Sequence, residues 1–101
     1  MAFVRVASKK DVLNGEVRVF PANGTNIALA NVDGTYYALQ DVCTHDGGPL
    51  GEGFIWGDEI ECPRHGARFD VKTGRVMALP AVLPVRTYPV QVEGDEVMVD
   101  V

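Results

Sequence analysis

Residues 26–39 read NIALANVDGTYYAL, which is two runs rich in aliphatic, β-branched and aromatic residues joined by Asp33-Gly34. Runs of this composition are typical of β-strands. An Asp-Gly pair between them favours a two-residue type I′ turn, because both turn positions require a positive φ. The stretch therefore predicts an antiparallel β-hairpin with strands over Asn26–Val32 and Thr35–Leu39.

Similar runs recur along the chain, bounded by Gly, Asn, Pro or Asp. They predict strands over Phe3–Val6, Glu16–Phe20, Glu59–Glu61, Ala67–Val71, Arg75–Ala78, Val85–Val92 and Glu96–Val101. In the last hairpin, Val90, Val92, Val97, Val99 and Val101 are expected on one face. A single helical turn is expected near Ser8–Asp11, where the spacing resembles a capping box. About nine short strands with close turns indicate one antiparallel all-β domain over residues 1–101.

The segment from about Asp41 to Gly57 lacks strand character. Loops of that length inside compact domains are usually functional. This loop also holds the first Cys and the first His, so we expect the functional site there.

Charge and hydropathy narrow the function classes. Fourteen acidic and nine basic residues give a formal net charge of −5. Nucleic acids and anionic membrane surfaces bind basic surfaces, so neither is expected as a partner, whereas a basic protein partner is favoured. The sequence has no signal-peptide pattern and no apolar run of about 18 residues, which predicts a cytoplasmic protein. Two cysteines without an export signal are expected to stay reduced.

All the cysteines and histidines of the chain fall between positions 43 and 65. They are Cys43, His45, Cys62 and His65, in a C-x-H-x₁₆-C-x-x-H pattern. The first pair is followed by a turn-rich stretch, Asp46–Gly53, and the second by Gly66. Both features allow the backbone to pass close to a bound group.

Four interpretations compete for these residues. They could be two buried thiols and two surface histidines without a metal, or a Cys–His nucleophile pair, which leaves the second pair unexplained. A structural Cys₂His₂ zinc site usually pairs Cys with Cys and His with His, unlike the mixed pairs here. A [2Fe–2S] cluster with two Cys on one iron and two His on the other suits the mixed pairs best, because each loop then supplies one ligand to each iron.

The pattern, with Gly-Gly-Pro-Leu at 47–50 and Gly66 after the second His, resembles the signature of Rieske-type iron–sulfur proteins. The resemblance extends through Arg68–Val76 and the proline loop Leu79–Pro84 to essentially the whole chain. It is strongest to the small Rieske ferredoxins that serve bacterial ring-hydroxylating oxygenases. It implies antiparallel sheets with two cluster-binding loops at one tip, and one [2Fe–2S] cluster per chain. Cys43 and Cys62 would hold one iron, and His45 and His65 the other, at the exposed tip.

Departures from the family pattern point to a subtype. High-potential respiratory members carry two further cysteines in a disulfide, and the matching positions here are Gly48 and Arg64. They also carry Ser and Tyr hydroxyls where this chain has Ala67 and Phe69. Because hydrogen bonds to cluster sulfurs stabilise the added electron, their loss predicts a potential toward the lower end of roughly −150 to +300 mV.

The resemblance implies a one-electron carrier with no catalytic site of its own. It would pass electrons from a flavin-containing reductase to a terminal oxygenase. In a second hypothesis, the protein is instead a bound subunit of a larger enzyme. That second hypothesis is a Rieske-like small subunit of a larger reductase, such as assimilatory nitrite reductase, and the third is a zinc module. A monomer is the simplest expectation. Arg64, Arg68, Asp46 and Glu52 flank the site as a solvated rim or as a docking surface.

Overall fold

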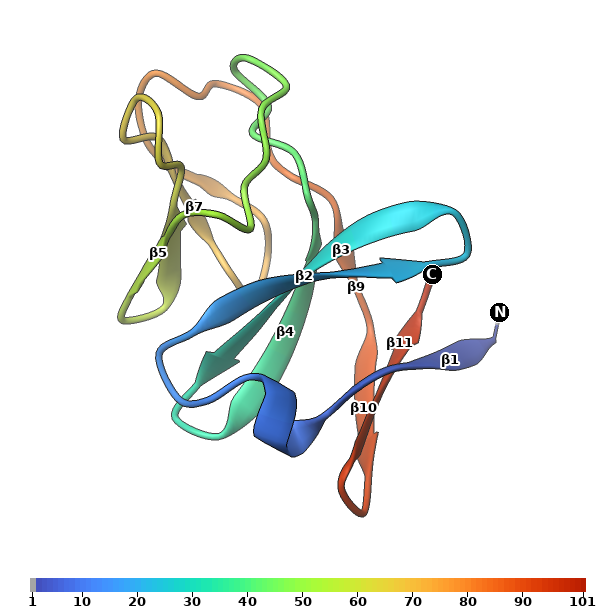
Figure 1. Cartoon of the computed structure of the whole chain (residues 1–101). Helices are drawn as coiled ribbons and strands as arrows, with labels where there is room; N and C mark the ends of the chain where they lie inside the picture. The colour runs from blue at the N-terminus through green and yellow to red at the C-terminus, as the bar shows by residue number, and fades with distance from the viewer. Residues whose placement is uncertain (1) are drawn as a thin grey trace.

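The computed structural model describes residues 2–101, which form three antiparallel β-sheets (Figure 1). The strands are β1 (Phe3–Ser8), β2 (Val17–Ala22), β3 (Thr25–Val32), β4 (Thr35–Gln40), β5 (Phe54–Trp56), β6 (Glu59–Glu61), β7 (Arg68–Asp70), β8 (Val76–Ala78), β9 (Thr87–Tyr88), β10 (Val90–Glu93) and β11 (Glu96–Asp100). One short 3₁₀ helix, η1 (Lys9–Asp11), follows β1. The prediction of an antiparallel all-β fold is confirmed.

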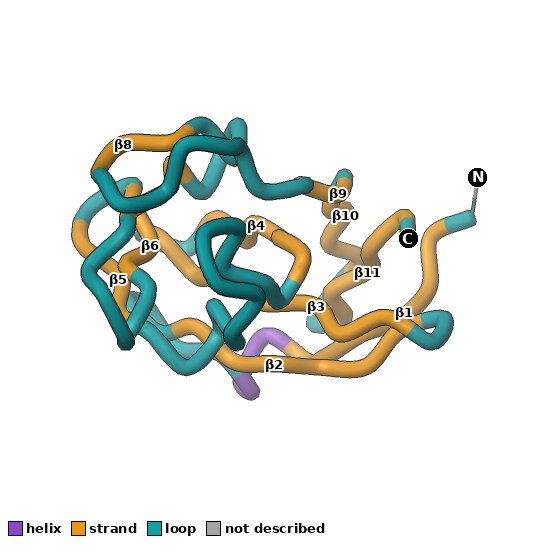
Figure 2. Tube along the Cα trace, turned by 90° about the horizontal axis from the view of Figure 1, so that it is seen from above, coloured by secondary structure: helices purple, strands orange, loops and turns teal. Residues whose placement is uncertain are grey.

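The sheets have the orders β1-β11-β10, β2-β3-β4-β9 and β5-β6-β7-β8. β1 pairs with β11, so the first and last strands of the chain lie side by side. The small β5–β8 sheet stands at the opposite end of the molecule, where loops gather beyond the strands (Figures 1 and 2). Function is therefore expected at that end, because long loops on a rigid scaffold commonly carry it.

Two local predictions are confirmed in detail. Asp33 and Gly34 have φ values of 52° and 87°, the left-handed conformation that a type I′ turn requires. The turn sets the pairing of β3 with β4, in which Val32 lies opposite Thr35. At the predicted helical turn, the backbone N–H of Ser8 donates to the carboxylate of Asp11 at 2.9 Å.

Two predictions of secondary structure are wrong. The segment Asp41–Gly57 contains a strand, β5, which pairs with β6 in a hairpin. The Phe-Ile-Trp run between Gly53 and Gly57 is too short to be recognised as a strand from its composition. Its strand conformation is stabilised by pairing with β6. The predicted strand Val85–Val92 is divided at Pro89 into β9 and β10, which belong to different sheets. Because proline has no N–H, it suits the point at which the chain leaves one sheet.

The core has two parts. One lies around Ile27, Leu29, Val97 and Val99, and the predicted valine face of the last hairpin packs there except for Val92, which is 41% exposed. The other part contains Leu39, Leu50, Ile60 and Phe69, together with both cysteines. The cysteines therefore lie at the inner side of the loop-bearing end.

None of the helical structure in residues 2–101 is long and apolar enough to cross a membrane.

Candidate metal centre

Two loops on either side of the β5–β6 hairpin carry the four predicted ligands. We call residues 41–53 the first site loop and residues 62–67 the second site loop. Both lie at the loop-bearing end of the molecule in Figure 1. A third segment, the proline loop at residues 79–84, lies beside them, and the hydroxyl of Thr44 donates to the carbonyl of Leu83 at 2.7 Å. The expected placement of two loops at one tip is confirmed.

The backbones of the two site loops fold in the same way around their cysteines. The N–H of Cys43 donates to the carbonyl of Gly48 at 2.7 Å, and the N–H of Cys62 donates to that of Ala67 at 2.7 Å. In each loop the cysteine carbonyl then accepts from a glycine four residues later, Gly47 or Gly66, with φ near +76°. Each half-site is thus a closed turn that fixes its cysteine.

The histidines occupy different places in these equivalent turns. His45 stands two residues after Cys43, whereas His65 stands three residues after Cys62. In the second site loop, Arg64 stands two residues after Cys62, where the first loop has His45. In the first site loop, Asp46 stands three residues after Cys43, where the second loop has His65. The mixed spacing seen in the sequence therefore comes from two similar turns in which the histidine has moved by one position.

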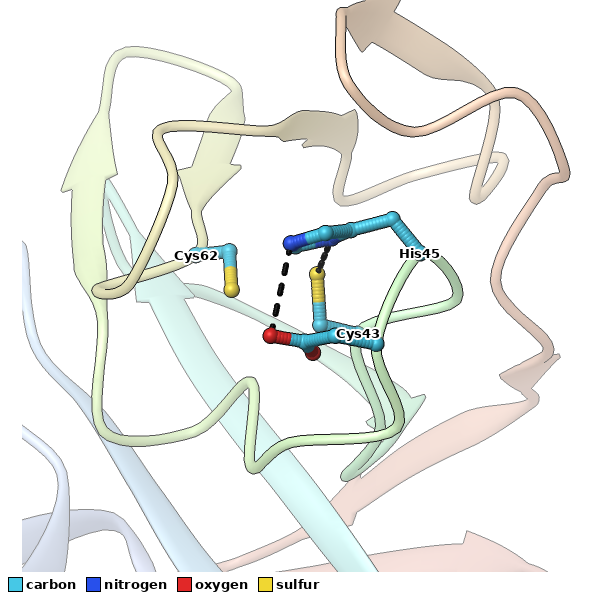
Figure 3. A group of neighbouring side chains, drawn as sticks. Cys43, His45 and Cys62 are labelled. Carbon is cyan, nitrogen blue, oxygen red and sulfur yellow. Dashed lines mark hydrogen bonds and ion pairs between the residues drawn. The ribbon is translucent and has the colours of Figure 1, made fainter.

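The structure brings the predicted ligands together from both loops (Figure 3). Ligand atoms of Cys43, His45, Asp46 and Cys62 all lie within 4.8 Å of one another. Sγ of Cys43 is 2.6 Å from Nδ1 of His45, and Nε2 of His45 is 2.9 Å from Nδ1 of His65. His65 lies outside this group and adjoins it through His45. Two sulfur donors and an imidazole close together, with a second imidazole beside them, suit a metal or an iron–sulfur cluster.

The four candidate ligands differ in how far they are exposed to solvent. Both cysteines are fully buried, the side chain of His45 is 9% exposed and that of His65 is 55% exposed. The expectation that both histidines are exposed at the tip is therefore correct only for His65. His45 is covered because its ring lies between the Cys43 thiol and the His65 ring.

Burial, with the neighbouring Cys62, raises the pKa of the Cys43 thiol to about 12. A thiolate at this place is unfavourable unless positive charge accompanies it, because burial disfavours the charged form. A metal supplies that charge and converts a coordinating thiol to thiolate. The electrostatics of the buried pair thus fit a metal-containing group.

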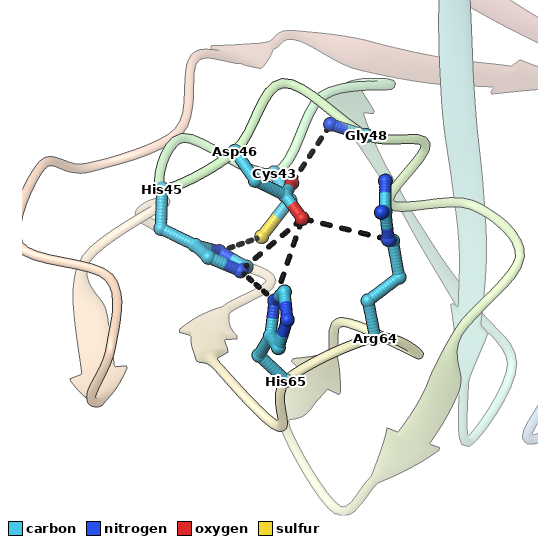
Figure 4. A network of polar contacts seen from close by, with 6 residues as sticks. All are labelled: Cys43, His45, Asp46, Gly48, Arg64 and His65. Carbon is cyan, nitrogen blue, oxygen red and sulfur yellow. Dashed lines mark hydrogen bonds and ion pairs between the residues drawn. The ribbon is translucent and has the colours of Figure 1, made fainter.

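Asp46 is a central residue of the site, although the sequence indicated only a place on its rim (Figure 4). Its carboxylate accepts from the N–H of Gly48 at 2.8 Å, and it lies 3.4 Å from His45 Nε2 and 3.5 Å from His65 Nδ1. Arg64 approaches the same carboxylate at 3.7 Å. The Gly48 N–H, followed by these basic groups, lowers the pKa of Asp46. Its position directly after His45 was the only sequence signal for this role.

The other flanking residues are less involved. Arg68 pairs with Glu61 at 3.0 Å and lies 5.7 Å above the ring of Trp56, so it belongs to the surface of the β5–β8 sheet. Glu52 is exposed. Of the four residues expected to flank the site, Asp46 and Arg64 make contacts at its centre.

Comparisons with known proteins agree with this geometry. The family model for the Rieske [2Fe–2S] domain matches residues 2–89. The ferredoxin component of biphenyl 2,3-dioxygenase from Rhodococcus jostii (strain RHA1) is 42% identical over 100 residues, covering 99% of this chain and 94% of that protein. The chain therefore belongs to the Rieske [2Fe–2S] domain family.

Solved structures narrow the class further. The ferredoxin of carbazole 1,9a-dioxygenase from Nocardioides aromaticivorans IC177 is 39% identical, with a TM-score of 0.92 and coverage of 98% of this chain and 97% of that chain. A ferredoxin solved in complex with the oxygenase of carbazole 1,9a-dioxygenase is 36% identical, with a TM-score of 0.89 over 96% and 91% of the two chains. This chain is a Rieske-type ferredoxin, an electron carrier whose cofactor is a [2Fe–2S] cluster.

A solved protein that is named after the small subunit of nitrite reductase shares the fold, with a TM-score of 0.85 over the full length of both chains. At 20% identity, this likeness concerns the fold alone.

Proposed function

We propose that this ferredoxin passes single electrons from a flavin-containing reductase to the terminal oxygenase of a ring-hydroxylating system in the cytoplasm. The observation that carries the proposal is the convergence of two thiols and two imidazoles at an end of the molecule where one imidazole is exposed. The ferredoxin components among its relatives, and the relative solved with its oxygenase, support the choice of acceptor.

We assign Cys43 and Cys62 as ligands of one iron, and His45 and His65 as ligands of the other. When bound, the cluster accepts and releases one electron. The buried cysteines would shield the inner side of the cofactor, and the two site loops would orient the histidines toward the surface. Neutral imidazoles in place of two thiolates leave the site less negative, which favours uptake of an electron.

The surface around His65 suits a protein partner. Leu79, Val82 and Leu83 in the neighbouring proline loop are exposed at 76%, 75% and 62%. Ala81 between them is fully buried in the same part of the core as the cysteines, and Thr44 binds Leu83. An exposed apolar patch that is anchored in this way is typical of an interaction surface. We propose that the oxygenase contacts His65 and this patch.

The proposal includes no catalytic residue, because each Cys and His of the chain is assigned to the cofactor. The pairing of β1 with β11 supports a single domain over residues 1–101. A monomer is proposed because the tip must be free for two successive partners.

The decisive experiment is chemical analysis followed by electron transfer. Protein purified without oxygen is expected to be reddish-brown and to contain iron and acid-labile sulfide in equal amounts. Reduction with dithionite should bleach the colour and give a rhombic paramagnetic signal. The reduced protein should then reoxidise rapidly with a terminal ring-hydroxylating oxygenase and slowly with oxygenase lacking its own cluster. A colourless protein with stoichiometric zinc, or a coloured protein that no such oxygenase reoxidises, would overturn the proposal.

A further inference from the structure

Because the two site loops fold in the same way, they make two similar contacts with each other. His45 occupies the second place after its cysteine and meets His65, which occupies the third place in the other loop. Arg64 likewise occupies the second place after Cys62 and meets Asp46, the third place after Cys43. The loops therefore cross at two similar contacts, one between histidines and one between opposite charges (Figure 4).

Local geometry holds the charged contact in position. One oxygen of Asp46 accepts from the N–H of Gly48 at 2.8 Å, while the other lies 3.7 Å from Nε of Arg64. A Cβ atom on Gly48 would lie 3.3 Å from Cδ and Nη1 of Arg64 and 3.1 Å from the Asp46 carboxylate. The absence of a side chain at Gly48 thus gives Arg64 room to lie across the first site loop.

The Arg64–Asp46 contact differs from the other contacts between the loops because neither of its residues is a proposed ligand. Within residues 2–101, the other polar side-chain contacts between the loops, His45–His65, Asp46–His65 and Cys43–Cys62, each involve a proposed ligand. The Arg64–Asp46 contact involves none. Because it joins two loops that carry one thiol and one imidazole each, separation of the loops must break it.

We propose that Asp46, Gly48 and Arg64 form an ionic clasp that holds the two site loops together and slows loss of the cofactor. Asp46 and Arg64 are positioning residues, since they act through the loops that carry the ligands. The proposal depends on the ligand assignment made above. The side chain of Arg64 is 60% exposed, so the effect is that of a surface ion pair and weakens with salt.

The test is the rate at which the loaded protein loses its visible absorption in excess EDTA at low ionic strength. Arg64→Gln is expected to accelerate the loss about two- to fivefold, the range for an exposed ion pair. Arg64→Lys, which keeps the charge, should restore most of the wild-type rate. Arg18→Gln is the matched control, because Arg18 makes a similar exposed pair with Glu16 at 3.6 Å. It should leave the rate unchanged.

Two further measurements separate the clasp from a general effect on folding. About 1 M NaCl, where the Debye length is about 3 Å, should bring the wild type toward the Arg64→Gln rate and leave that variant nearly unaffected. Arg64→Gln should also have no effect in an Asp46→Asn background, because the partner charge is already gone.

Equal rates for Arg64→Gln and wild type, or equal acceleration by Arg18→Gln, would overturn the clasp. So would an undiminished effect of Arg64→Gln in the Asp46→Asn background. Each of these results still requires a coloured wild-type protein. A wild type without visible absorption would instead overturn the ligand assignment, so the two failures are distinguishable.

Discussion

Nε2 of His45 lies 2.9 Å from Nδ1 of His65, and the two rings meet edge to face at 75°. The residues come from different loops, yet only His65 has much exposed surface. The pair therefore runs from the covered side of the site to the molecular surface. If both are ligands, His65 is the one that a partner protein can touch.

Replacement of His65 tests this assignment. His65→Cys adds a thiolate to the site, which disfavours the added electron and should lower the potential by about 100 mV, because all-cysteine clusters lie near −400 mV. Protein-film voltammetry measures the shift. Leu13→Cys is the control, since it adds a thiol at a residue that is 60% exposed outside both site loops. A variant that keeps both its cluster and its potential would show that His65 is not a ligand.

A new hydroxyl beside the cysteines should act in the opposite direction. Ala67 is fully buried in the same part of the core as Cys43 and Cys62, and its carbonyl accepts from the Cys62 N–H. In Ala67→Ser, a hydrogen bond to a cluster sulfur worth about 1 kcal/mol would raise the potential by about 40 mV. Ala38→Ser places a hydroxyl in the other part of the core and should cause no shift. An equal shift in both variants would contradict the hydroxyl argument.

The sequence was most informative where chemistry requires a particular residue. The Asp33-Gly34 turn was predictable because two consecutive positive φ values restrict the choice of residue. The four candidate ligands could be named from the sequence because the chain has no Cys or His elsewhere. By contrast, β5 has three residues and owes its conformation to pairing with β6, a long-range effect that local composition does not report.

The contacts of the site were less predictable than its members. Asp46 looked like one more acidic residue in a chain with fourteen. Its central position depends on how the two loops cross, which brings Arg64 and His65 to its carboxylate. Arg68, three residues after His65, faces away to Glu61 and Trp56, since residues on a strand alternate between faces.

Metal binding to the metal-free chain should depend on pH through Cys43. Its pKa of about 12 means that the thiol is protonated at neutral pH, so a metal must displace that proton to bind the thiolate. The apparent affinity for Co²⁺ should therefore rise at least tenfold per pH unit between about pH 6 and 8. The thiolate-to-cobalt absorption band measures it. Cys43→Ser should reduce this dependence, and a pH-independent wild-type affinity would contradict the prediction.

Substitutions at two glycines distinguish the cost of backbone strain from the cost of steric crowding. Gly74 and Gly94 both have positive φ, at 78° and 60°. A Cβ atom at Gly74 would lie only 2.0 Å from the carbonyl oxygen of Val85, whereas at Gly94 nothing lies within 4 Å. Gly94→Ala should cost about 1 kcal/mol, and Gly74→Ala about 3 kcal/mol or more because the backbone must also shift. Thermal unfolding of the two loaded proteins measures the difference, and equal melting temperatures would contradict it.

The proline loop provides a test of partner contact. Val82→Ser and Leu83→Ser remove apolar surface that is exposed in the free protein, so folding should change little. If the oxygenase covers this patch, each substitution should raise KM for the ferredoxin about tenfold, corresponding to about 1.4 kcal/mol. Steady-state oxygenase assays with varied ferredoxin concentration measure it. Leu13→Ser is the control, and an equal effect there would exclude a specific role for the proline loop.

The pairing of Phe3 with Asp100 has a practical consequence. Both ends of the chain emerge from the sheet that lies away from the site loops (Figure 1). A flexible tether on either end would therefore leave the redox-active tip free to turn toward an electrode or a fused enzyme. Such tethers could raise the local concentration of the carrier without altering the surface through which it exchanges electrons.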